Sequence, residues 1–87
     1  MNELKLISGE FSTEEAKEVL MNIFADKIRF HDKKIISSLV RGIPDNTSEE
    51  RINDLRENIK QLLDIIELAN NEGKSLKIKS TINIELI

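Results

Sequence analysis

His31 is the residue best suited to chemistry, because it is the only histidine of the chain and its ordinary pKa lies near neutral pH. In a helix, Lys27 and Lys34 lie one turn away on either side of it, whereas Asp32 points about 100° away. A functional interpretation makes His31 a proton-transfer or anion-binding residue. The alternative interpretation is structural: His31 falls among apolar side chains and covers the edge of the core.

Basic residues surround His31 between positions 26 and 41. Residues 26–43 carry a net charge of +3, whereas residues 44–72 carry −5 and the whole chain −3. Two interpretations are open: this basic island attracts the acidic second helix, or it meets an anionic partner such as nucleic acid. The low sequence pI of 5.2 and the lack of a nucleic-acid-binding motif make nucleic acid the less favoured partner. The candidate anion-binding residues of the basic island are Lys27, Arg29, His31, Lys33, Lys34 and Arg41.

Other residue types give little support to catalysis. The chain has no cysteine, so disulfides and thiolate metal sites are excluded, and one histidine with scattered carboxylates is a poor metal site. The carboxylate pairs Glu14/Glu15 and Glu49/Glu50 fall in the first turns of expected helices, where they cap and balance the helix dipole. We therefore expect no enzyme, no metal and no cofactor.

The first helix, expected at about 13–40, carries His31 and the basic island. Ser12-Thr13-Glu14-Glu15 is a capping box that predicts its start, and Gly42 with Pro44 predicts its end. Helical spacing places one group of side chains in a single apolar sector. This sector comprises Ala16, Val19, Leu20, Ile23, Phe24, Phe30 and His31.

A second helix is expected at about 48–72, with a capping box at Thr47-Ser48-Glu49-Glu50 and an end at Gly73. Its apolar residues recur every three or four positions and form a seam. We expect the seam to pack against the first helix rather than against another chain, because the short loop between the helices predicts an antiparallel hairpin. The seam comprises Ile52, Leu55, Ile59, Leu62, Ile66 and Ala69.

Strands are expected at both ends of the chain, at residues 3–7 and 75–87, because apolar and polar residues alternate there. Ser8-Gly9-Glu10 is expected to turn the chain after the first strand. The predicted fold class is α+β, in the order β-α-α-β. A long antiparallel helix hairpin packs on a small antiparallel sheet, and residues 1–87 form a single domain.

The two expected strands differ in length, and the longer one predicts a partner. A two-stranded sheet is marginal alone, and an exposed apolar edge invites pairing. We expect residues 80–87 to pair outside the protomer, extending the sheet by homodimerisation. The alternatives are a terminus that frays and a different protein partner. The candidate protein-interface residues are Leu63, Ile65, Leu68, Ile82, Ile84 and Leu86.

These observations predict a small non-catalytic binding or assembly module, working as a homodimer through the C-terminal strand. The alternative is a nucleic-acid-associated regulator that uses the basic island 27–41. A third interpretation is an accessory subunit that binds a small ligand near His31. No signal peptide or membrane-spanning segment is recognisable, so we expect a cytoplasmic protein. The abundance of Ile, Lys and Asn suggests a bacterial source.

Overall fold

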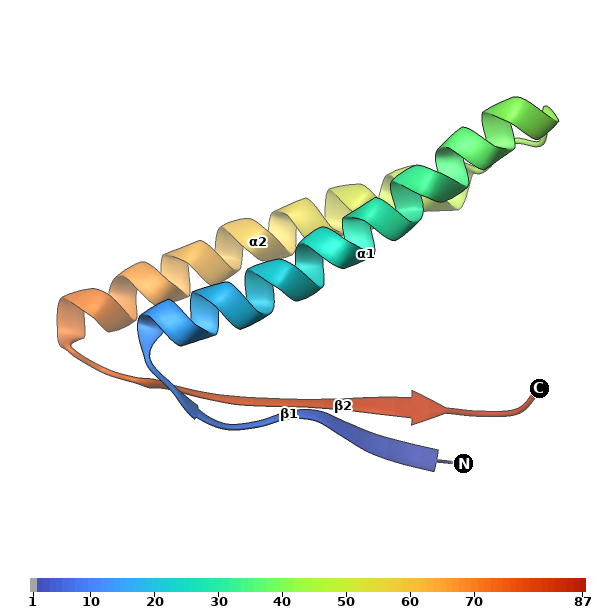
Figure 1. The fold of residues 1–87 in the computed structure, drawn as a ribbon. Helices are drawn as coiled ribbons and strands as arrows, with labels where there is room; N and C mark the ends of the chain where they lie inside the picture. Colours follow the sequence, from blue (N-terminus) through green and yellow to red (C-terminus); the bar gives the residue numbers. More distant parts are fainter. Residues whose placement is uncertain (1) are drawn as a thin grey trace.

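The computed structural model describes residues 2–87, except for the side chain of Asn46, and contains a helix hairpin beside a two-stranded sheet (Figure 1). The elements follow in the order β1 (Asn2–Phe11), α1 (Thr13–Arg41), α2 (Asn46–Glu72) and β2 (Leu76–Ile84). This order and the antiparallel pairing of β1 with β2 confirm the predicted α+β fold. Neither described helix is both long and apolar enough to cross a membrane.

The ends of α1 form as predicted. The Ser12 hydroxyl accepts from the backbone N–H of Glu15 at 3.1 Å, and the Glu15 carboxylate accepts from the N–H of Ser12 at 3.0 Å. These bonds satisfy donors that the first turn of a helix leaves free, and the Ser12 N–H that donates to the Glu15 carboxylate lowers the pKa of Glu15. Gly42 ends the helix with a φ of 71°, which glycine adopts without steric cost.

The start of α2 differs from the prediction. The helix begins at Asn46 and is capped by Asp45, whose carboxylate accepts from the N–H of Ser48 at 2.9 Å. The expected capping box with Thr47 as its cap is therefore wrong. Asp45 is an equally good cap that lies two residues earlier, so the helix starts sooner. The other end is as expected, since Gly73 has a φ of 64°.

The predicted seam of α2 packs against α1 within the same chain. Ile52, Leu62, Ile66 and Ala69 are buried, and the remaining seam residues are half-buried. The Thr13 hydroxyl also donates to the Asn70 side chain, which ties the start of α1 to the end of α2. Within residues 2–87 no ion pair joins the two helices. Apolar packing, rather than direct ion pairing, holds the hairpin.

The first strand is twice as long as expected, because the predicted turn does not form. Ser8-Gly9-Glu10 continues β1 in an extended conformation as far as Phe11. The register slips between Lys5 and Ile7, which leaves Leu6 as the extra residue of a β-bulge. The bulge shifts the alternation of side chains, so that Leu4 and Ile7 share one face of the sheet.

The expected mismatch in strand length is therefore wrong. Antiparallel pairing runs from Asn2 opposite Ile84 to Phe11 opposite Leu76, so residues 80–84 pair within the protomer. Leu86 lies beyond the end of β2 and is fully exposed. What stays unpaired in the described chain is the outer edge of each strand, including the side of β2 that faces away from β1.

The sheet covers only part of the hairpin. Its contacts are mainly with α1, and the two layers diverge toward the loop between the helices (Figure 1). Ile7 is buried, but Leu4 and Ile82, which pair farther along the same face, are 52% and 40% exposed. The half of the sheet near the chain termini thus presents an apolar face that α1 does not reach.

Candidate functional site

His31 lies in the contact between α1 and α2 and is only 7% exposed. Its Nδ1 atom lies 3.3 Å from the Ser48 hydroxyl oxygen, and the Ser48 hydroxyl donates to Asp45 at 2.8 Å. Because the Ser48 proton is directed to Asp45, the Ser48 oxygen is left to accept from Nδ1–H of His31. This chain of bonds joins α1 to the first turn of α2.

The order of this chain of bonds does not make Ser48 a nucleophile. In a serine triad the imidazole accepts the serine proton and the carboxylate orients the imidazole. Here the carboxylate of Asp45 takes the serine hydrogen bond, and its pKa is lowered by the bonds from the Ser48 N–H and hydroxyl. The arrangement can hold the histidine ring in place, and it leaves Ser48 unactivated.

The other ring nitrogen of His31 is the unusual atom of the site. Nε2 is buried and has no hydrogen-bond partner among the described residues. Burial lowers the pKa of His31, and the nearby charges of Lys27, Lys34 and Arg51 lower it further, while Asp45 opposes them. Neutral His31 with its proton on Nδ1 therefore carries an unused lone pair on Nε2.

The structure divides the predicted basic island. Lys27 and Lys34 flank Phe30, with their Nζ atoms 5.0 and 5.1 Å from its ring centroid, and the ring edge meets His31 at a centroid distance of 5.3 Å. Arg29 is paired with Asp26 at 3.1 Å. Lys33 and Arg41 are exposed and are not brought to this group. Phe30, which the sequence places in the apolar sector of the first helix, is half exposed.

Arg51 is the member of this group that sequence reasoning missed. It belongs to α2, three positions after Ser48, and lines a cavity of about 370 Å³ together with Lys27 and His31. In an antiparallel hairpin, residues at similar distances from the loop face each other. His31 lies ten residues before the end of α1, whereas Arg51 lies only five residues after the start of α2. The rule therefore points to Arg56, and no local signal in the sequence reveals Arg51.

The predicted protein-interface residues are all exposed, but they do not form one surface. Ile82 and Ile84 lie on the face of the sheet turned toward α1, and Leu86 follows the strand. The other three, Leu63, Ile65 and Leu68, lie on α2, which is not the helix that the sheet mainly contacts.

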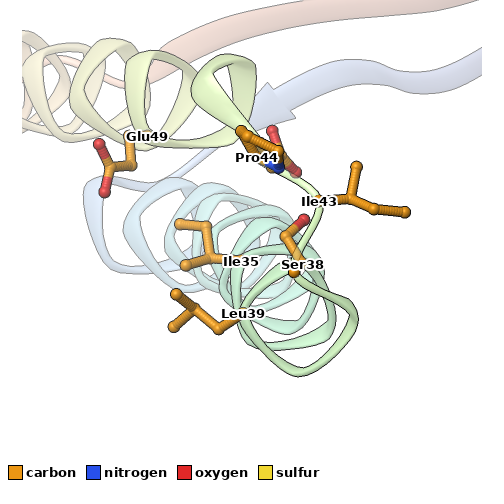
Figure 2. A pocket seen from close by; sticks show the side chains of 8 residues that line it. Ile35, Ser38, Leu39, Ile43, Pro44 and Glu49 are labelled. Atoms are coloured by element: carbon orange, nitrogen blue, oxygen red, sulfur yellow. The ribbon is translucent and has the colours of Figure 1, made fainter.

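A further apolar surface, which the sequence did not reveal, lies at the tip of the hairpin. Ile35 and Leu39 of α1 point to the same side as Glu49 of α2, while Ile43 in the loop points away (Figure 2). All four residues are among those that line a cavity of about 370 Å³. The exposed apolar side chains of this tip are Ile36, Leu39, Val40 and Ile43.

Comparison with known proteins supplies no function by descent. No protein-family model matches the chain, and neither the curated proteins nor the solved structures that were searched contain a significantly similar one. Within residues 2–87, no three histidine, cysteine, aspartate or glutamate residues are grouped as metal ligands. The physical features of the chain itself must therefore carry any proposal.

Proposed function

We propose that this chain is a non-catalytic assembly module that works as a homodimer through its C-terminal strand. The observation that carries the proposal is the free outer edge of β2 next to an uncovered apolar sheet face. A strand edge offers a row of N–H and C=O groups to a second strand, and two strands alone make a marginal sheet. Pairing with a second copy satisfies both requirements.

The surface area of the protomer supports a second copy as the partner. A compact protein of 10.0 kDa exposes about 5,200 Å², whereas this chain exposes 7099 Å². Stable homodimers bury about 2,000 Å² or more in total, or roughly 1,000 Å² from each copy. The excess of roughly 1,900 Å² per chain is therefore large enough to supply a stable interface.

The geometry of strand pairing indicates how the copies fit. Antiparallel pairing of β2 with its copy requires a twofold axis perpendicular to the sheet, so both hairpins lie on the same face. The uncovered end of one β2, near Ile82 and Ile84, then lies beside the start of the other β2, which α1 of that copy covers. In this arrangement each hairpin shelters part of the apolar face that the other leaves open.

The remaining exposed apolar residues are not needed for this interface. Leu63, Ile65 and Leu68 belong to α2, which makes few contacts with the sheet, and Val40 belongs to the hairpin tip. They are free to contact the component that the dimer assembles with. Ser48 is not activated by His31, which favours binding over catalysis.

Substitution of Ile82 by glutamate tests the proposal. Ile82 is already 40% exposed, so Ile82→Glu should leave the folded protomer intact, as judged by circular dichroism. Burying the new carboxylate in the dimer is costly, so the dissociation constant should rise at least tenfold in light-scattering measurements. The matched control is Val40→Glu, the same kind of change at an 82% exposed position of the tip. If both variants weakened dimerisation equally, or if only Val40→Glu weakened it, an interface at the sheet would be ruled out.

The alternative, a nucleic-acid-associated regulator, is supported by one observation: Phe30 is exposed beside Lys27 and Lys34. An exposed ring can stack with a base while neighbouring lysines contact phosphates. Against it, Arg29 is paired with Asp26 and the chain is acidic. Retention on single-stranded DNA or RNA at about 0.05 M salt, lost in Phe30→Ala, would favour this alternative; no retention removes it.

A further inference from the structure

We propose that the cavity between α1 and α2 beside His31 binds a small oxyanion of the phosphate or sulfate class. The cavity lies midway along the hairpin and has a volume of about 370 Å³, within the range of roughly 300–1,000 Å³ that is common for ligand sites. This site is separate from the edge of β2, so it does not depend on the proposed dimer. The residues that line it are Lys27, His31, Arg51, Asp54, Leu55 and Asn58.

Three cations lie around His31 without a direct counterion. Lys27 and Lys34 come from α1 and Arg51 from α2, and none of them is ion-paired within residues 2–87. Two of the three, Lys27 and Arg51, line the cavity itself. A guanidinium and an ammonium contributed by two different helices suit the several oxygens of a tetrahedral oxyanion. The positive charge of these exposed side chains beside the cavity thus indicates the chemical class of the ligand.

His31 supplies a second, independent indication of a ligand. Its ring lines the cavity, and its buried Nε2 atom has no partner, although buried ring nitrogens normally form hydrogen bonds. Because Ser48 fixes the Nδ1 proton, a proton gained by the ring goes to Nε2. Nε2 is covered by neighbouring atoms, so a bound oxyanion would favour that protonation through its negative charge, without a direct bond to the ring. Binding of the anion is therefore coupled to uptake of one proton by His31.

The acidic neighbours limit which anion fits. Asp54 lines the cavity, and Asp45 lies behind Ser48, so a bound anion meets two carboxylates as well as three cations and His31. The remaining lining residues, Leu55 and Asn58, add no charge. A small, highly charged oxyanion can remain near Lys27 and Arg51 and away from Asp54. Removal of the Asp54 charge should consequently strengthen binding.

The single histidine allows a direct test by nuclear magnetic resonance. The Hε1 resonance of His31 is followed from pH 4.5 to 8 in sodium sulfate and in sodium chloride of equal ionic strength. Sulfate is chosen because it does not itself titrate in this range. We expect the pKa of His31 to be higher in sulfate by about one unit, which corresponds to about tenfold tighter binding to the protonated form. Identical titration curves in the two salts would overturn the proposal.

Variants separate a specific site from general attraction. Arg51→Gln should abolish the difference between sulfate and chloride, and Asp54→Asn should enlarge it. Arg56→Gln removes the same charge from α2 outside the cavity and should leave the difference unchanged. If Arg51→Gln and Arg56→Gln had equal effects, sulfate would be acting through the overall charge, and the site would be wrong. A shift caused by a short oligonucleotide but not by sulfate or inorganic phosphate would also overturn it, in favour of a nucleic-acid partner.

Discussion

At the scale of single residues, the surroundings of His31 hold its ring in place and in the neutral form. Its Nδ1–H bond to Ser48 connects the two helices, which favours a fixed ring in the core. Its surroundings of Lys27, Lys34 and Arg51, together with burial, disfavour the charged ring and lower its pKa. Sequence alone identified His31 and the two lysines, but not Ser48 and Arg51. Those two residues come from another helix, and only the hairpin brings them to His31.

The lowered pKa of His31 predicts a pH dependence of stability. The pKa of His31 is below 6.5 in the folded chain and near 6.5 in the unfolded chain, so the unfolded chain binds more protons between these values. The contribution of neutral His31 to stability is complete above pH 6.5 and falls as the pH drops toward the folded-state pKa. At one fixed protein concentration, the wild-type Tm should therefore decrease between pH 7.5 and 5.5 in thermal unfolding followed by circular dichroism.

The variant His31→Asn isolates the effect of the histidine. The amide of asparagine can still donate to Ser48 but does not titrate, so the Tm should change much less over the same pH range. Glu15 and Asp45 do not interfere, because their pKa values are lowered from 4.5 and 3.8 and they titrate at more acidic pH. A slope that is unchanged in His31→Asn would contradict the role assigned to His31.

At the scale of the elements, local signals predicted the helices better than the strands. The capping box at Ser12 and the glycines at 42 and 73 act through neighbouring backbone groups, so the sequence reveals them directly. The turn expected at Gly9 failed because pairing with β2 keeps that segment extended. The bulge at Leu6 was unpredictable for the same reason, since it places Ile7 against α1, and that demand arises from tertiary packing.

The α1–α2 seam makes a quantitative prediction for the hairpin. Leu62 is 9% exposed in the seam, so Leu62→Ala should lower the free energy of unfolding by about 2–5 kcal/mol. Leu39→Ala is the matched control, because this leucine of α1 is 78% exposed and should change stability by less than about 0.5 kcal/mol. Urea unfolding monitored by circular dichroism measures both values. A similar cost for the two variants would mean that the seam is not the main source of stability.

At the scale of the whole molecule, the protomer is open and elongated. Its radius of gyration is 16.1 Å, whereas a compact chain of this length has about 12 Å. The extents of 51 × 31 × 15 Å describe a thin plate rather than a sphere. The apolar tip at Ile36, Leu39 and Val40 and the distal sheet face both remain uncovered in this shape.

The sequence could predict that apolar surface exceeds what the protomer buries, but not where the excess lies. The expected location was a long unpaired strand end at residues 80–87. The full length of β1 removes that mismatch, and what stays open is the outer edge of each strand and the sheet face beside them. The location of this open surface depends on how far the sheet and the hairpin diverge. No local pattern of residues in the sequence indicates that divergence.

The absolute mass in solution tests the central proposal most directly. Multi-angle light scattering of the wild-type chain, over at least a tenfold range of concentration, should give twice 10.0 kDa. A dimer is expected because the excess surface of each protomer is large enough to supply a stable interface. A mass of 10.0 kDa at every concentration, from a chain that circular dichroism shows to be folded, would contradict the account.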